Sequence, residues 1–305
     1  MSRKIVAAVG SLACIGTFLT VASGGPARAA SVAHPHAVVS TGYDLVAADG
    51  GVFVFGKSGG FYGSLPSIGV HVNNIVGIVP TADEKGYFLV GNDGGVFAFG
   101  DAPFEGSLPG IGVHPRLPIA GIVPSSDDLG YFLVGADGGV FAFGDAQYEG
   151  SLPGLGAIAT DVASIASTPD NHGYWVLERS GQVTNFGTAP NVDTFPLSQF
   201  GGVSQFYVSI AATNDGQGYW VLDSWGAVWL EGDAGSFGDA QSVYPPLGTP
   251  NAGQPVSIVP TSDSQGYWIV GSNGAIYNFG DALNFGSLPS IGVVPNLPVV
   301  GAVPT

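Results

Sequence analysis

The sequence has little positive charge, one cysteine and a single long apolar run. Seven lysines and arginines stand against 23 aspartates and glutamates, which gives a formal net charge of −16 at pH 7. A chain this acidic repels phosphate backbones, so we expect no nucleic-acid partner. One cysteine cannot form an intrachain disulfide, so packing and strand pairing must hold the fold together.

The long apolar run lies near the N-terminus and is typical of an export signal. Two basic residues precede the apolar stretch Ile5–Ala22, and Ala27-Arg28-Ala29 supplies the small residues of a cleavage site. We therefore predict a signal peptide over residues 1–29 and a linker over residues 30–41. The protein is then secreted or associated with the cell surface, without membrane insertion after cleavage. A signal segment that is kept as an anchor is the alternative.

Glycine and proline are abundant, with 50 and 22 residues, while 45% of the chain is hydrophobic. Turn residues that separate short aromatic and β-branched runs predict an all-β protein. The stretch GYFLVGNDGGVFAFGDAPFEGS, residues 86–107, shows this pattern, because two alternating apolar runs meet at Asp93-Gly94. Asp-Gly between such runs predicts a β-hairpin with a type I′ turn.

Six copies of this stretch follow one another along the chain. Each copy begins with a Gly-Tyr pair, and the intervals between pairs are 44, 44, 43, 45 and 48 residues. The pairs begin at Gly42, Gly86, Gly130, Gly173, Gly218 and Gly266. In the second copy we expect four strands, at Ile75–Val79, Tyr87–Gly91, Gly95–Phe99 and Pro103–Ser107. A period in this range with about four strands per unit predicts a six-bladed β-propeller over residues 42–305.

The beginning and the end of the repeat region complement each other. The first copy lacks a leading strand, whereas the final stretch VVGAVPT, Val299–Thr305, matches IVGIVPT at Ile75–Thr81. Ring closure removes sheet edges that would otherwise invite aggregation. We infer that the C-terminal strand pairs with the first blade and closes the ring.

An aspartate precedes the Gly-Tyr pair by three residues in five of the copies. These residues are Asp83, Asp127, Asp170, Asp215 and Asp263. Asp carboxylates commonly accept hydrogen bonds from nearby turn amides. We therefore expect a structural role for this repeated aspartate rather than a catalytic one.

The copies resemble a repeat found in exported actinobacterial proteins, of the general form GYWLVASDGGVFAFGDA. The similarity is carried by residues 86–107, by GYFLVGADGGVFAFGDAQYEGS at 130–151 and by GYWIVGSNGAIYNFGDALNFGS at 266–287. It covers essentially the whole chain after the leader. The resemblance implies a secreted or surface-associated, propeller-like repeat region, and it supplies no catalytic residues.

Signatures of catalysis are missing from the sequence. No HExxH motif occurs, so we do not expect an enzyme. Residues 213–220 and 261–268 come close to the Asp-box of sialidases, but only Arg116 and Arg179 follow the leader to bind a substrate carboxylate. An EF-hand-type loop is also absent, so we expect no cofactor. Weak Ca²⁺ binding by clustered carboxylates is the alternative.

Copies four and five, residues 161–256, depart most from the others. Glu231 stands where the other copies have phenylalanine, and Trp225 stands at a hairpin tip. Glu178 and Asp223 occupy a column that is otherwise mostly small. A carboxylate in a core position needs solvent or a partner, and a tryptophan at a tip offers a contact surface. We predict a ligand-binding site made of Trp225, Glu231, Asp223 and Glu178. Repeat drift with local repacking is the alternative.

These features predict an exported, non-catalytic binding or scaffold module that recognises protein or glycan at the cell surface. A rigid propeller can present loops to either kind of ligand, and the fold alone does not choose between them. The alternative is an extracytoplasmic carbohydrate-active hydrolase that uses carboxylates near the central channel, because glycoside hydrolysis requires two opposed carboxyl groups.

Overall fold

The computed structural model describes residues 40–56, 60–125, 129–191, 195, 199–200, 203–241 and 253–305. The predicted leader and most of the predicted linker lie outside the described residues. Within them the chain is all-β, and its strands are joined by turns and by single-turn 3₁₀ segments. No helix in this part of the chain is long and apolar enough to cross a membrane.

The repeats form six three-stranded antiparallel sheets, and the strand that carries the Gly-Tyr pair is central in each. Sheet one contains β1 (Gly42–Ala47), β2 (Val52–Gly56) and β20 (Val299–Pro304). Sheets two and three contain β3 (Ile75–Pro80), β4 (Gly86–Gly91) and β5 (Val96–Gly100), then β6 (Ile119–Pro124), β7 (Gly130–Gly135) and β8 (Val140–Gly144). Sheet four contains β9 (Val162–Ser167), β10 (Gly173–Glu178) and β11 (Val183–Gly187). Sheets five and six contain β14 (Tyr207–Ala212), β15 (Tyr219–Asp223) and β16 (Val228–Glu231), then β17 (Pro255–Pro260), β18 (Gly266–Gly271) and β19 (Ile276–Gly280). A separate pair is formed by β12 (Gln199–Phe200) and β13 (Val203–Ser204).

The prediction of four strands per unit is wrong, because each of these sheets has three. The segment Pro103–Ser107 forms no strand and leads into the 3₁₀ turn η2 (Pro109–Ile111). Instead of pairing with β5, the chain folds back onto the hairpin: the Leu108 amide donates to the Gly94 carbonyl over 3.1 Å. The Leu108 side chain is fully buried against Gly94, where an added Cβ would lie 2.5 Å from Leu108 Cδ1. The packing of this leucine on the hairpin therefore takes the place of a fourth strand.

The hairpin predicted at Asp93-Gly94 is confirmed, but its turn is of a different type. Of these two residues only Gly94 has a positive φ, +80°, and the Gly91 amide donates to the Gly95 carbonyl over 2.8 Å. The loop therefore has three residues and ends on a left-handed glycine. The Asp93 carboxylate stabilises it by accepting a hydrogen bond from the Gly95 amide at 3.0 Å.

The repeated aspartate caps its turn, as expected, in the four copies where the structure describes it. Asp83 Oδ1 accepts hydrogen bonds from the Lys85 amide and the Thr81 hydroxyl, both at 3.1 Å. The same amide contact recurs at Asp170, Asp215 and Asp263. Asp127 lies outside the described residues.

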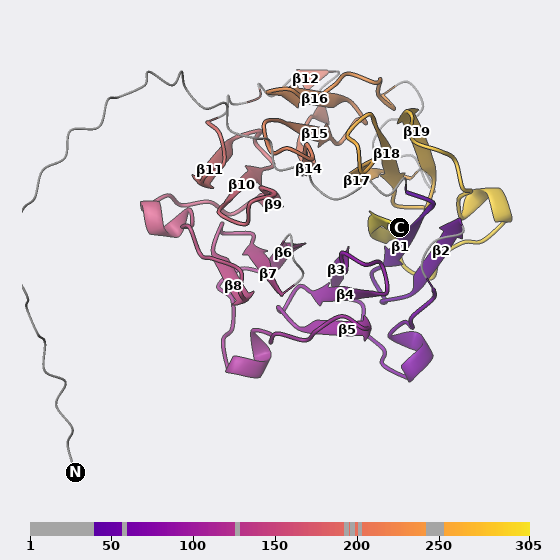
Figure 1. The fold of residues 1–305 in the computed structure, drawn as a ribbon, viewed down its shortest axis with the longest axis horizontal. Helices are drawn as coiled ribbons and strands as arrows, with labels where there is room; N and C mark the ends of the chain where they lie inside the picture. Colours follow the sequence, from indigo (N-terminus) through magenta and orange to yellow (C-terminus); the bar gives the residue numbers. More distant parts are fainter. Residues whose placement is uncertain are drawn as a thin grey trace, which may run out of the picture. The chain divides into compact units, whose positions relative to one another are not determined.

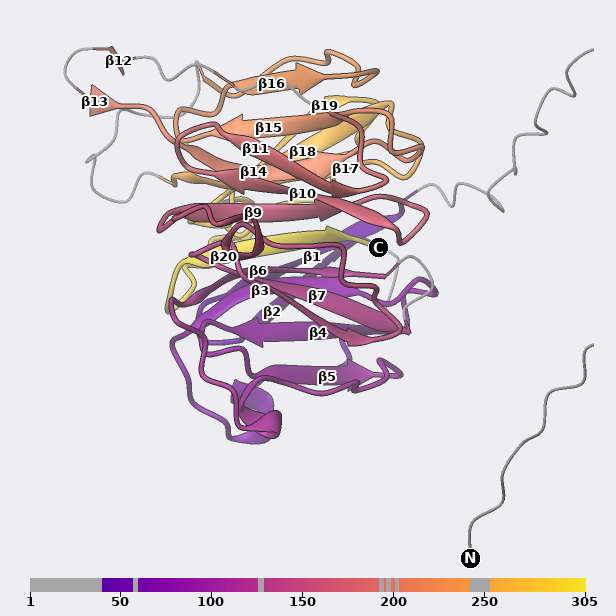
Figure 2. The same ribbon diagram turned by 90° about the vertical axis from the view of Figure 1, so that its left-hand side faces the viewer.

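The first strands of the sheets contact one another in a closed cycle. The order is β20, β3, β6, β9, β14, β17 and back to β20. Figure 1 shows these strands around a common centre, with third strands such as β5, β8 and β19 farther out, and Figure 2 shows the strands edge-on. The predicted pairing of the C-terminal strand with the first copy is confirmed: β20 runs antiparallel to β1, with Tyr43 opposite Pro304 and Leu45 opposite Ala302.

Neighbouring sheets are joined by a repeated aromatic contact. An aromatic residue of one central strand packs on the Gly-Tyr tyrosine of the next, as Phe88 does on Tyr131 with ring centroids 5.1 Å apart. The hydroxyl of that tyrosine donates to a glycine carbonyl in the preceding connection, Gly106 in this case. Tyr43 makes the equivalent bond to Gly286, which links sheet one to sheet six. In five of the six repeats, this hydrogen bond explains both the tyrosine and the glycine of the preceding connection.

Candidate binding surface at the hairpin-turn end

A cavity of about 580 Å³ lies on the axis of the ring, at the end where the central and third strands turn. All six first strands contribute an aliphatic side chain near their beginning, so its wall is an apolar collar. The collar residues are Val76, Ala120, Ala163, Val208, Val256 and Val300. Such a wall favours an apolar group with a few fixed polar contacts around it.

Polar groups from sheets four to six surround the mouth of this cavity. Asp161, Arg179 and Gln254 line it, together with the aromatic ring of Phe206. The Arg179 guanidinium carbon lies 5.1 Å from the centroid of the Phe206 ring, which is the geometry of a cation–π contact. The Arg179 amide donates to the Asp161 carbonyl and its carbonyl accepts from the Tyr207 amide, each at 3.0 Å. Arg179 is therefore fixed by its backbone while its exposed side chain reaches toward sheet five.

Glu178 lies next to Arg179, at the end of β10. Burial, and then the negative charge of Asp161, raises the pKa of the Glu178 carboxyl above its usual value. Asp161 and Glu178 are thus two carboxyl groups that disfavour simultaneous ionisation, and of the two only Asp161 lines the cavity with Arg179.

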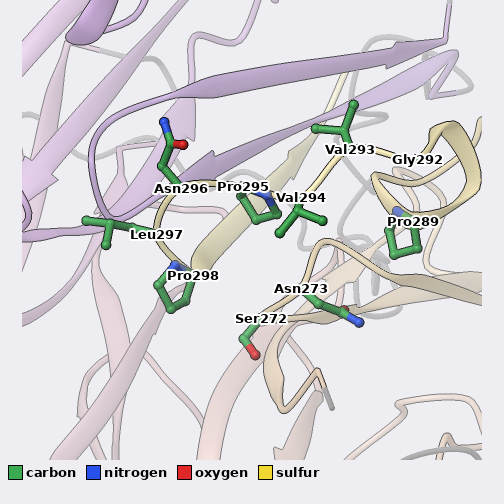
Figure 3. Close-up of a pocket in the computed structure, with 10 residues that line it drawn as sticks. All are labelled: Ser272, Asn273, Pro289, Gly292, Val293, Val294, Pro295, Asn296, Leu297 and Pro298. Carbon is green, nitrogen blue, oxygen red and sulfur yellow. The ribbon is translucent and has the colours of Figure 1, made fainter. Parts of the chain in front are cut away.

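A second hollow, of about 730 Å³, lies between the β18–β19 turn and the connection from sheet six to sheet one (Figure 3). The connection contributes Val293, Val294 and Leu297 together with three prolines, and the turn contributes Ser272 and Asn273. Val294 is 87% exposed, so the wall of this hollow is apolar and open to solvent. Its polar contacts come from uncharged side chains.

The two hollows are neighbours, separated by a hydrogen-bonded pair of residues. Gln254 lines the axial cavity and Ser272 lines the outer hollow. The Gln254 amide donates to Ser272 Oγ at 2.9 Å, and the Ser272 amide donates to the Gln254 carbonyl at 2.8 Å. An extended ligand could therefore reach from the axis across Ser272 to the connection between sheets six and one.

Asp223, one of the predicted ligand residues, is fully buried and holds its own hairpin together. Its Oδ1 accepts from the amides of Trp225 and Ala227 at 2.8 and 3.0 Å. Its Oδ2 accepts from Trp229 Nε1 at 3.1 Å and from the Gln205 side-chain amide. Its exposed fraction is 0%, so a ligand has no access to this carboxylate in the structure.

In sheet five the capping carboxylate stands two positions earlier in the turn than in sheet two, and a second substitution in the same turn accompanies this change. In sheet two, a Cβ on Gly91 would lie 2.6 Å from Asp93 Oδ1, so a longer side chain there competes with the turn aspartate. In sheet five, Asp223 fills the column of Gly91 and takes over the capping of the turn. The position equivalent to Asp93 then no longer has to supply a carboxylate, and in sheet five it holds Trp225.

The other predicted residues do not gather in one place. Trp225 is partly exposed at the tip between β15 and β16, at the same end of the ring as Glu178. Glu231 lies at the opposite end of β16, paired with Tyr219 and half-buried. The structure therefore brings Trp225 and Glu178 to the cavity end of the ring and leaves Glu231 at the other end.

None of the four residues that line the mouth of the axial cavity was predicted: Asp161, Arg179, Phe206 and Gln254. A sequence signal existed for Arg179, which stands in a column of small or uncharged residues. The other members of that column are Ala48, Asn92, Ala136, Ser224 and Ser272. Among the described residues, no group of three or more His, Cys, Asp or Glu side chains could hold a metal ion.

The fold and the cavity define a class: an all-β repeat protein of six three-stranded antiparallel sheets around an apolar axial cavity. No family model matches the chain, and no curated protein matches it.

Proposed function

We propose that this chain is an exported six-bladed β-propeller that acts as a non-catalytic binding module at the cell surface. The closed cycle of first strands and the pairing of β20 with β1 support the propeller. The N-terminal signal pattern and the resemblance to exported actinobacterial repeats support the location. The observation that carries the binding role is the axial cavity, which all six sheets line and which Arg179 and Phe206 flank.

The chemistry of the surface favours a protein ligand over a glycan. The collar and the outer hollow are walled mainly by aliphatic side chains and proline, which suit the aliphatic side chains of a peptide. A sugar ring would need an open aromatic face, and Arg179 covers a face of Phe206. We therefore favour a protein segment that inserts an apolar side chain into the collar and hydrogen-bonds with Arg179 and Gln254.

One observation favours a second function, hydrolysis of a carbohydrate. Burial, and then the charge of Asp161, raises the pKa of the Glu178 carboxyl, as a general acid requires. Glycosidases use such a pair at a set separation. If the wild-type protein released reducing sugar from a polysaccharide and Glu178→Gln did not, the protein would be a hydrolase and not a binding module.

The binding role predicts a specific loss in the Arg179→Gln variant. Peptide and glycan arrays probed with the full chain are expected to identify peptides. The affinity of Arg179→Gln for these peptides should be about tenfold or more below that of wild type, because a charge-assisted hydrogen bond is lost. Trp225→Ala should weaken only peptides long enough to reach the neighbouring tip. Arg116→Gln, which removes an exposed arginine away from the cavity lining, is the matched control. Equal affinities for Arg179→Gln and Arg116→Gln would contradict the proposed site.

A further inference from the structure

Asp44 is a buried carboxylate in the middle of β1, at a position where every other sheet has an aromatic side chain. Its exposed fraction is 1%. The aromatic residues of the other sheets are Phe88, Phe132, Trp175, Trp220 and Trp268. Each of these packs on the tyrosine of the next sheet, with ring centroids 5.1 to 5.8 Å apart. Only the contact between sheets one and two has a carboxylate in place of this ring.

The surroundings of Asp44 give its carboxylate little compensation. Among the described residues, its Oδ1 has no hydrogen-bond partner. Tyr87 of sheet two occupies the place of the packed tyrosine, and Tyr62 lies edge-on to it at 5.9 Å. The hydroxyl of Tyr87 already donates to the Gly63 carbonyl, and that of Tyr62 to the Glu84 carbonyl at 3.2 Å.

The charged group that acts on Asp44 from the neighbouring sheet is also a carboxylate. Glu84 lies in the turn between β3 and β4, with a φ of +58°. Burial, and then the charge of Glu84, raises the pKa of Asp44 to about 7. Burial and the charge of Asp83 raise the pKa of Glu84 as well. Lys85 in the same turn is exposed and pairs with Asp83 at 2.7 Å. Asp44, Glu84, Tyr62 and Tyr87 therefore form a seam of acidic groups.

Asp44 also lies in the strand that closes the ring. It is paired with Val54 of β2 on one side and with Val303 of β20 on the other. A charge on Asp44 thus acts at two places together: the contact with sheet two and the hydrogen-bonded pairing with β20. An ionised, incompletely paired carboxylate in such a position favours any opening that admits water.

We propose that Asp44 is a proton-binding site that controls how tightly the ring is closed. With its proton, the side chain is a neutral group that the buried contact between sheets one and two tolerates. Without it, the seam between sheets one and two loosens and β20 is held less firmly. The protein is therefore expected to be most tightly closed under mildly acidic conditions and to open more readily at neutral and alkaline pH.

The direction of the pH effect follows from proton binding. A carboxyl group in the unfolded chain loses its proton near pH 4, whereas Asp44 in the folded protein keeps its proton up to about pH 7. Over this interval the folded state holds one more proton than the unfolded state, so its stability falls as the pH rises. The contribution of this group is fully present below about pH 4 and is lost by the time the pH passes 7.

The test is a comparison of thermal unfolding between pH 4.5 and 8.5 for wild type and Asp44→Asn. Relative to the variant, the melting temperature of wild type is expected to fall by about 10 °C across this range. Asp44→Phe, which restores the aromatic residue of the other sheets, serves as a second non-titrating variant should the asparagine impair folding. Asp137→Asn, which alters a turn aspartate of sheet three, is the control and should keep the wild-type pH slope.

A second readout separates the closing of the ring from overall stability. Amide hydrogen exchange of β1 and β20, compared between wild type and Asp44→Asn at the same pH, should be faster in wild type at pH 8 and equal at pH 5. Identical pH slopes in wild type and both Asp44 variants would overturn the proposal. The proposal would also be overturned if the melting temperature of wild type fell with pH as expected while amide exchange at β1 and β20 did not differ between wild type and Asp44→Asn.

Discussion

Removal of Val299–Thr305 is expected to abolish the cooperative fold or to lower its melting temperature by more than about 10 °C. These residues contribute β20, whose Val299 and Val303 are buried, and their loss exposes one whole edge of β1. The deletion also removes the Val299 amide, which donates to the Ser272 carbonyl of sheet six at 2.8 Å. The measurement is thermal unfolding followed by far-ultraviolet circular dichroism.

A peptide that carries the deleted strand provides the control for this experiment. Added in excess, residues 296–305 should restore part of the lost stability, because binding to the folded state alone raises its stability by mass action. A scrambled peptide should not. An unchanged unfolding transition after the deletion would show that β20 does not close the ring.

Replacing Asp223 with alanine is expected to destabilise the fold by about 3–5 kcal/mol. The substitution leaves two backbone amides, the Trp229 indole and the Gln205 side-chain amide without their common acceptor. Buried donors that lose their acceptor each incur the full cost of desolvation. Urea unfolding at equilibrium gives the free-energy difference.

The matched variant for Asp223→Ala is Asp93→Ala in sheet two. Asp93 is exposed and accepts one hydrogen bond, from the Gly95 amide, so we expect a cost of about 1 kcal/mol. Equal costs for the two variants would contradict the central role of Asp223 in its hairpin. Loss of ligand binding by Asp223→Ala without loss of stability would instead support the original prediction that it contacts the ligand.

Most of the strand arrangement could be predicted from the sequence, because its repeats make the evidence redundant. The Gly-Tyr strands, the hairpins and the pairing of Val299–Thr305 with the first copy all follow from patterns that occur several times. The turn type was missed because Asp-Gly fits two kinds of hairpin loop, and the choice depends on where the Asp93 carboxylate binds. The fourth strand was overpredicted because the burial of Leu108 against Gly94 is a long-range contact that a local pattern does not encode.

The candidate site was harder to predict, because departures from a repeat have more than one cause. Asp223 and Trp225 differ from the other copies together, as an exchange of capping roles within one turn. Arg179 gains its importance from Phe206 and from a cavity that all six sheets build, which no single column of the repeat shows. Asp44 was within reach of the sequence, since it departs from five aromatic residues in its own column.

Backbone hydrogen bonds join the sheets at the hairpin-turn end, and one of them cannot form. The Ile75, Ile119, Val162, Tyr207 and Val299 amides each donate to the preceding sheet. Pro255 holds the same place in sheet six and has no amide hydrogen. Among the described residues, this bond therefore joins β20 to sheet six, whereas its equivalent is missing at this end between sheets five and six. The junction of sheets five and six depends instead on side-chain contacts, such as the hydrogen bond that the Ile258 amide donates to Ser209 Oγ at 3.3 Å.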